Sequence, residues 1–151
     1  MYRRMGLYLV AGVLLATVAQ AGTKEPSWRG SGGWGAGMPY ASLFDATRLI
    51  RVAGEVARIE RVVPQVGMAE GYALVLRSRD QLQTVHLGPV WFLERQDYSV
   101  EAHEEVEIVG SRVSLDGQPV IVATVLITNG RTLQLRDAEG LPVWSSWRRT
   151  Q

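Results

Sequence analysis

The feature that most constrains this chain is a period-two alternation of apolar and polar residues. From position 49 onward, Ile50, Val52 and Val56 fall on one side, with charged or small residues between them. This alternation is typical of a β-strand with one buried face. Gly54 interrupts the apolar series and the alternation slips by one residue before Ile59, which predicts a bend or bulge within the strand.

Further segments of the same character follow, separated by turn residues. Strands are expected over residues 72–77, 82–87, 106–115 and 120–127, and residues 132–135 and 143–144 are expected to form a terminal hairpin. Arg79-Asp80-Gln81 turns the chain, and Asp116-Gly117 is the strongest hairpin signal. Pro89 is suited to open a short helix with Val90 and Leu93 on its apolar side.

The order of these elements predicts an all-β fold. A short helix between the third and fourth strands of a five-stranded barrel is the layout of an OB-fold. A generic β-sandwich is the alternative, although it would not need a helix at that point. We therefore expect an OB-fold-like β-barrel with a C-terminal hairpin over residues 48–145, followed by a basic tail at residues 146–151.

Residues 1–21 have the three parts of an export signal. A basic start with Arg3 and Arg4 precedes an apolar stretch at 5–19, and Ala21 ends a small-x-small cleavage site. The stretch is shorter than the roughly 20 apolar residues that a membrane-spanning helix needs. We predict cleavage between Ala21 and Gly22, with retention as a membrane anchor as the alternative. Both outcomes place the domain outside the cytoplasm, in the periplasm or attached to a membrane facing it.

Charge and cysteine content exclude several classes of function. The chain has 16 Lys and Arg against 15 Asp and Glu, a net charge of +1, and loss of Arg3 and Arg4 with the signal makes it −1. Such a chain lacks the positive field that nucleic-acid binding usually needs. The absence of cysteine excludes a thiolate zinc site, a covalently attached c-type haem and a cysteine nucleophile.

Residues 22–47 have the composition of a glycine-rich linker, with an unusual number of aromatic residues. Trp28, Trp34 and Tyr40 lie among glycines and serines, where a plain spacer carries few aromatic side chains. One interpretation is that these side chains pack on the domain surface and tether the arm to it. The other is an adhesive arm for a partner or a membrane surface.

Four segments together carry a family resemblance: Gly33-Trp34-Gly35 with Pro39-Tyr40; residues 85–94; residues 109–113; and residues 133–137 ending at Pro142-Val143-Trp144. They resemble a family of small exported bacterial proteins with an OB-like (BOF-like) domain, mostly uncharacterised, which implies the fold but no chemistry. The chain is also similar to small magnetosome-associated proteins of the Mam type. That second resemblance implies a retained N-terminal membrane segment and a part in magnetite crystal growth.

A mixed basic and aromatic face is the strongest candidate for binding. The candidate ligand-binding residues are Tyr72, Arg77, His86, Trp91 and Arg112, and Arg79, Arg131 and Arg136 add to the basic character. His86 is expected to point out of the core together with Thr84, because Val85 and Leu87 face the other way. Such a face suits an envelope protein or a small anionic ligand, and nucleic acid is an improbable ligand outside the cytoplasm.

Catalytic and metal signals are poor. The acidic stretch around His103 offers His103, Glu101 and Glu104 as weak metal candidates, but consecutive carboxylates do not converge easily on one ion. No serine elbow, phosphate loop or dinucleotide fingerprint occurs, so we expect neither an enzyme nor a cofactor.

The sequence thus predicts a non-catalytic binding or accessory protein of the cell envelope. The alternatives are a magnetosome-membrane accessory protein that influences magnetite growth and a weak metal-binding or redox accessory. A magnetosome accessory protein would lie in the magnetosome membrane or lumen.

Overall fold

The computed structural model describes residues 31–145. The predicted signal with Ala21 and Gly22, the first part of the predicted linker with Trp28, and the basic tail at 146–151 lie outside the described residues. Within the described part, no helix is long and apolar enough to cross a membrane.

Strands dominate the described chain. Two 3-10 turns come first, and a single turn of α-helix separates the third strand from the fourth. The elements are η1 (Ala41–Leu43), η2 (Ala46–Arg48), β1 (Leu49–Val62), β2 (Gly71–Ser78), β3 (Gln81–Pro89), α1 (Val90–Leu93), β4 (Glu105–Leu115), β5 (Gln118–Thr128) and β6 (Arg131–Gln134).

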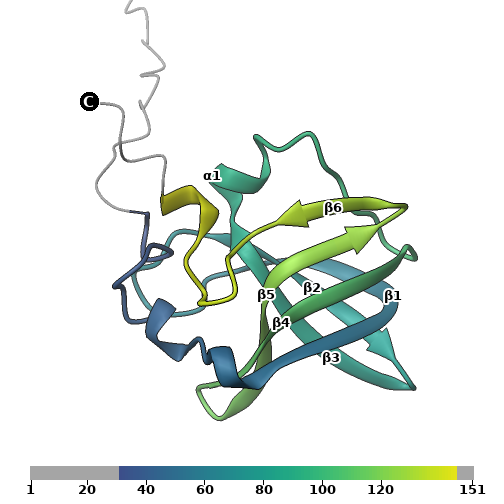
Figure 1. The fold of residues 1–151 in the computed structure, drawn as a ribbon, viewed down its shortest axis with the longest axis horizontal. Coiled ribbons are helices and arrows are strands. Elements are labelled where there is room, and N and C mark those ends of the chain that lie inside the picture. The colour runs from purple at the N-terminus through teal and green to yellow at the C-terminus, as the bar shows by residue number, and fades with distance from the viewer. Residues whose placement is uncertain (1–30, 146–151) are drawn as a thin grey trace, which may run out of the picture.

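The strands form a barrel. Their order is β3-β2-β1-β4-β5-β6 with antiparallel neighbours, and a parallel pairing of β3 with β5 closes the ring at Val85–Ile121 and His86–Val122 (Figure 1). The short helix α1 lies between β3 and β4, as in an OB-fold. The predicted all-β, OB-like barrel is confirmed.

The end of the barrel differs from the expectation. Residues 131–134 pair with β5 through a turn at Asn129-Gly130, in which both residues have positive φ. The predicted terminal hairpin is present in a short form: Arg136 and Pro142 form an isolated bridge, and the Val143 N–H donates to the Leu135 carbonyl. The amides of Leu135 and Arg136 both donate to the Thr124 carbonyl on β5, where the regular pairing of β6 with β5 ends.

The bulge predicted in the first strand is present in β1. The β1–β2 register shifts between Val56 and Arg58, where one extra residue is accommodated. Gly54 is required just before it, because a Cβ at this position would overlap the carbonyl oxygen of Arg77. β1 pairs with β4 up to Glu55 and with β2 from Glu55 onward, so the bend is where this strand changes partner.

Both faces of the β2–β3 pair are buried. Leu74 lies opposite Val85 on the face that lines the barrel interior, while Ala73 lies opposite His86 on the outer face. Two terminal segments cover the outer face, and Figure 1 shows both on one side of the barrel. The side chains packed together on this outer face form what we call the outer aromatic cluster. Its members are Trp34, Tyr40, His86, Phe92, Arg136 and Trp144.

The part of the predicted linker that the structure describes therefore packs on the domain. The indole nitrogen of Trp34 donates to the carbonyl of Ala69 over 2.8 Å, and that of Trp144 donates to the carbonyl of Trp34 over 2.9 Å. The rings of Trp34 and Tyr40 meet edge to face at 4.9 Å. The tethering interpretation is confirmed for Trp34 and Tyr40.

Candidate functional site

The five residues predicted to bind a ligand do not form one face. Tyr72 and Trp91 lie at the α1 end of the barrel, where the Tyr72 hydroxyl donates to Glu94 over 3.1 Å and the Trp91 ring meets Phe92 edge to face. Arg77 and Arg112 lie toward the β2–β3 turn. His86 belongs to the outer aromatic cluster, between these two groups.

The expected exposure of His86 is wrong. Its side chain does point to the outer face of β3. The N-terminal arm, by which we mean the described residues 31–48 before β1, covers that face and leaves only 4% of His86 exposed. The Tyr40 hydroxyl lies 3.0 Å from His86 Nδ1, and the two rings stack. Burial, helped by the positive charge of Arg136, lowers the pKa of His86 to about 4, so this imidazole is neutral near pH 7.

Arg136 is also buried rather than part of a basic surface. Its guanidinium donates to the carbonyls of Leu87 (3.0 Å) and Ala123 (2.6 Å), and it lies 5.0 Å from the ring centre of Trp144. Burial lowers its pKa, while burial raises the pKa of nearby Tyr40 to about 12. The sequence offered no signal for this placement, because the covering side chains come from distant segments.

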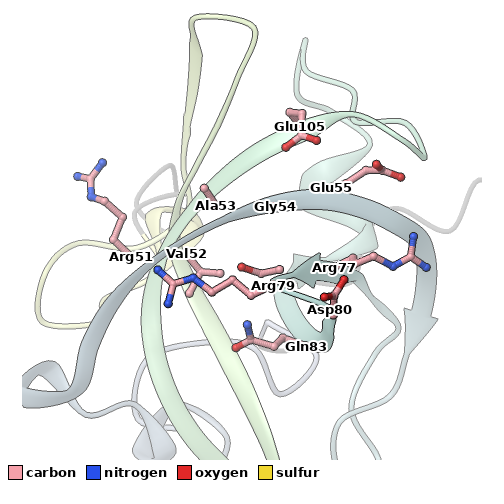
Figure 2. A pocket seen from close by; sticks show the side chains of 11 residues that line it. Arg51, Val52, Ala53, Gly54, Glu55, Arg77, Arg79, Asp80, Gln83 and Glu105 are labelled. Carbon is pink, nitrogen blue, oxygen red and sulfur yellow. The ribbon is translucent and has the colours of Figure 1, made fainter.

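A polar cleft of about 680 Å³ opens at the opposite end of β2 and β3 (Figure 2). It lies between the first half of β1, the β2–β3 turn and the start of β4. It exists because β1 leaves β2 unpaired before Glu55, so the β2–β3 turn stands away from the barrel wall. The lining residues of this polar cleft are Arg51, Val52, Ala53, Gly54, Glu55, Arg77, Ser78, Arg79, Asp80, Gln83 and Glu105.

Two arginines of the polar cleft are free to meet a ligand. Among residues 31–145, no ion pair engages Arg77 or Arg79, whereas Arg51 is paired with Glu107. Figure 2 shows the guanidinium groups of Arg77 and Arg79 pointing to opposite ends of the cleft. They therefore suit an extended ligand with separated anionic groups better than one small oxyanion.

The surroundings of the polar cleft fix its chemistry further. Arg112 donates to Gln83 over 3.0 Å, which places a fourth guanidinium beside the cleft in addition to those of its three lining arginines. Carboxylates of Glu55, Asp80 and Glu105 balance the arginines, so the cleft is polar but not strongly charged. Its lining contains no histidine or cysteine. This arrangement can hold a polar ligand through paired charges and amide groups, without a nucleophile and base in contact.

The weak metal candidates do not come together. His103 Nδ1 lies 3.3 Å from a carboxylate oxygen of Glu55 on β1, rather than between Glu101 and Glu104. His103 also has a positive φ of 73°, which the tight turn at 102–103 imposes. Across the described residues, no three acidic or histidine side chains form a group that could hold a metal ion.

Comparison with known proteins links the barrel to one family. A model of the MamS/MamX magnetosome protein family matches residues 48–133, which run from the end of η2 through β6. No curated protein matches the chain. The match supports the resemblance to magnetosome-associated proteins, whereas the resemblance to small exported OB-like proteins stays a prediction.

Proposed function

This chain belongs to the MamS/MamX magnetosome protein family, and from that membership we propose that it is a non-catalytic accessory protein of the magnetosome that influences mineral growth. The observation that carries the proposal is the family match itself, which covers the whole barrel. The barrel acts as a binding module, and its polar cleft is the binding site.

The composition of the polar cleft supports binding rather than catalysis. Arg77 and Arg79 are unpaired and separated, Gln83 offers an amide, and Glu105 adds a carboxylate at the rim. Such a mixture recognises a polar surface or segment of another molecule through charge-assisted hydrogen bonds. The ligand of the proposal is an acidic protein segment with separated carboxylates that can reach both Arg77 and Arg79.

The outer aromatic cluster supports a ligand other than nucleic acid. OB-folds that bind oligonucleotides use the face of strands 2 and 3. In this chain Trp34 and Tyr40 cover the outer face at Ala73 and His86, so that face is filled by the protein itself. The near-neutral net charge of the chain also favours a ligand other than nucleic acid.

Attachment to the magnetosome membrane is part of the proposal. Residues 1–21 would remain as an anchor, with the barrel on the periplasmic or luminal side. The experiment is deletion of the gene from its magnetosome-forming host, complementation with a tagged chain, and electron microscopy of the crystals. We expect an altered crystal size distribution on deletion and its restoration by the complementing chain.

Two variants address the site. Arg79→Glu should fail to restore the crystals, because it reverses the charge at one end of the polar cleft. Arg95→Glu reverses an exposed arginine near α1 and should restore them, which makes it the matched control. Unchanged crystals in the deletion strain would contradict a role in mineral growth. Recovery of the tagged chain only in other envelope fractions would favour a general envelope accessory instead.

A further inference from the structure

The connection between β1 and β2 is an uncharged loop with an exposed tip. Residues 62–69 carry no charged side chain, and Gln65 is their one polar residue. The Met68 N–H donates to the Gln65 carbonyl over 3.1 Å, and Gly67 has a positive φ of 85°, the arrangement of a type II turn with Val66 and Gly67 at its tip. Val66 is fully exposed and Val63 is more than half exposed. We call residues 62–69 the valine loop, because two valines project from it into solvent.

The other hairpin turns of the described barrel have a different composition. The β2–β3 turn holds Arg79 and Asp80, the β4–β5 turn holds Asp116, and the β5–β6 turn holds Asn129. Such polar residues are usual in exposed turns. A single exposed valine would need no explanation, but a whole exposed connection without a charge is unlike these turns. The composition of the valine loop therefore indicates a surface that meets an apolar phase.

The valine loop is held in place by contacts at its base. The Ala69 N–H donates to the Gly32 carbonyl over 2.8 Å, and the Ala69 carbonyl accepts from the Trp34 indole over 2.8 Å. The charged residues that flank the loop are Arg61 and Glu70, and their side chains pair at 3.0 Å. These charges therefore lie at the base of the loop, and its tip presents apolar side chains.

Both ends of the described chain lie near the valine loop. Gly32 is bonded to Ala69, and near the other end the Trp144 indole donates to the Trp34 carbonyl over 2.9 Å. Before the described part, about ten linker residues follow the predicted membrane segment at 1–21, and they reach roughly 35 Å when fully extended. After it, residues 146–151 include a tryptophan and two arginines, residue types that suit the interface of an anionic membrane. The loop is thus on the side of the barrel that is joined to the predicted anchor.

A lipid surface fits the valine loop better than protein does. The tip is a protruding turn, so a second copy docked on it would bury far less than the roughly 800 Å² per partner of a stable interface. The adjoining linker at 22–30 is polar apart from Pro26 and Trp28, which makes it a poor cover for the loop. The interface of a bilayer, by contrast, takes up a small apolar projection without a matching pocket.

We infer that the valine loop is a membrane contact, whose tip enters the interface of the bilayer that holds the anchor. Val63 and Val66 lose exposed apolar area there, and the anchor makes the contact intramolecular, so that a weak contact is sufficient. The polar cleft lies at the other end of β2 and then faces away from the membrane, toward its partner. This inference rests on the membrane attachment in the proposed function.

The experiment uses the full chain in vesicles of phosphatidylethanolamine and phosphatidylglycerol. The chain contains no cysteine, so Val66→Cys accepts a single environment-sensitive fluorophore. In the vesicles we expect its emission to shift to shorter wavelength and to be quenched by lipids brominated on their acyl chains. Leu82→Cys is the matched control, because it replaces an exposed leucine at the polar-cleft end of β3, where the same label should stay unquenched. Adding Val63→Asp should reduce the quenching at position 66, since a charge resists entry into the membrane.

Each outcome decides the inference. Chains that float with the vesicles but carry a label as unquenched at position 66 as at position 82 would overturn it and leave the anchor intact. A shift to shorter wavelength without quenching would also overturn it, because the linker or a second copy would then cover the loop. Quenching that Val63→Asp leaves unchanged would mean that the label, and not the loop, drives the contact. Chains that fail to float would overturn this inference together with the membrane attachment in the proposed function.

Discussion

The two sides of the β2–β3 pair are packed in different ways. The barrel interior is filled by aliphatic side chains of the strands, such as Leu74, Val85 and Leu126. The outer aromatic cluster is built from large rings around two buried polar groups, His86 and Arg136. The interior is thus made by the strands, while the outer cluster joins the segments before β1 and after β6 to His86 of β3 and Phe92 of α1.

The difference shows how this chain buries polar groups. In the interior, the backbone is satisfied by the strand ladder and the side chains bring almost no polar atoms. In the outer aromatic cluster, a neutral imidazole bonds to Tyr40, and a guanidinium bonds to two strand carbonyls. The outer cluster therefore depends on specific partners, and we expect it to respond to pH and to single-atom changes more than the interior does.

The largest expected effect is on stability, from Trp34→Ala. Loss of a buried tryptophan costs about 3–5 kcal/mol, and this variant also removes the hydrogen bond to Ala69. Urea unfolding of Trp34→Ala beside Leu74→Ala, a barrel-interior control expected to lose about 2–5 kcal/mol, measures both regions. A loss below about 1 kcal/mol for Trp34→Ala would contradict the packed arm.

The next effect is a dependence of stability on pH. The pKa of His86 is about 4 in the folded chain against an ordinary 6.5, so between these values the unfolded chain binds more protons. The stabilisation from the neutral imidazole is complete above pH 6.5 and falls as the pH drops toward 4, by about 3 kcal/mol in total.

Two substitutions isolate this dependence. His86→Gln should flatten the fall in unfolding free energy measured between about pH 7 and pH 4.5. His103→Gln is the matched control, because it removes the other histidine, whose side chain is 80% exposed, and leaves the outer aromatic cluster intact. If the unfolding free energy of His86→Gln fell with pH as steeply as that of the wild type, the pH dependence would come from carboxylates instead.

A smaller loss of folding stability is expected from Gly71→Ala. A Cβ on Gly71 would overlap the Trp34 ring and the backbone carbonyl oxygen of Gly88, so both the Trp34 side chain and the backbone have to shift. Overpacking of this kind costs about 1–3 kcal/mol. Thermal unfolding measures the loss. The double variant with Trp34→Ala should show a smaller effect of the added methyl group, with the close approach to the Gly88 carbonyl remaining. Fully additive losses would contradict the contact between Gly71 and Trp34.

The smallest effect is expected from Tyr40→Phe, which removes the hydroxyl near His86 and keeps the ring packing. The loss of one buried hydrogen bond costs about 1 kcal/mol, measured by urea unfolding. In His86→Gln the same substitution tests whether the two side chains act together. A Tyr40→Phe variant as stable as the wild type would show that the hydroxyl is satisfied elsewhere.

Much of the barrel could be predicted from the sequence, because its signals are local. The alternation around Val52 and Val56 indicated β1, and Asp116-Gly117 indicated the β4–β5 hairpin. The turn at Asn129-Gly130 is a further local signal, and it joins residues 131–134 to β5, whereas the sequence analysis expects residues 132–135 to pair with 143–144.

The candidate sites depend on contacts between distant residues and were less accessible to sequence reasoning. His86 is buried by Tyr40, 46 residues away, and Trp34 and Trp144 are 110 residues apart. No periodicity in the sequence connects such segments. The polar cleft follows from the change of partner in β1, for which the sequence holds two local signs, Gly54 and the slip of the alternation before Ile59.

The arm has a further consequence for any ligand of the β2–β3 outer face. Tyr40 is joined to β1 by only a few residues, so the arm behaves as a tethered competitor with an effective concentration in roughly the millimolar range or above. A free molecule that binds the bare face must overcome this intramolecular competition before it gains any contact. The arm thus sets an affinity threshold on that face and directs weak partners to the open parts of the barrel.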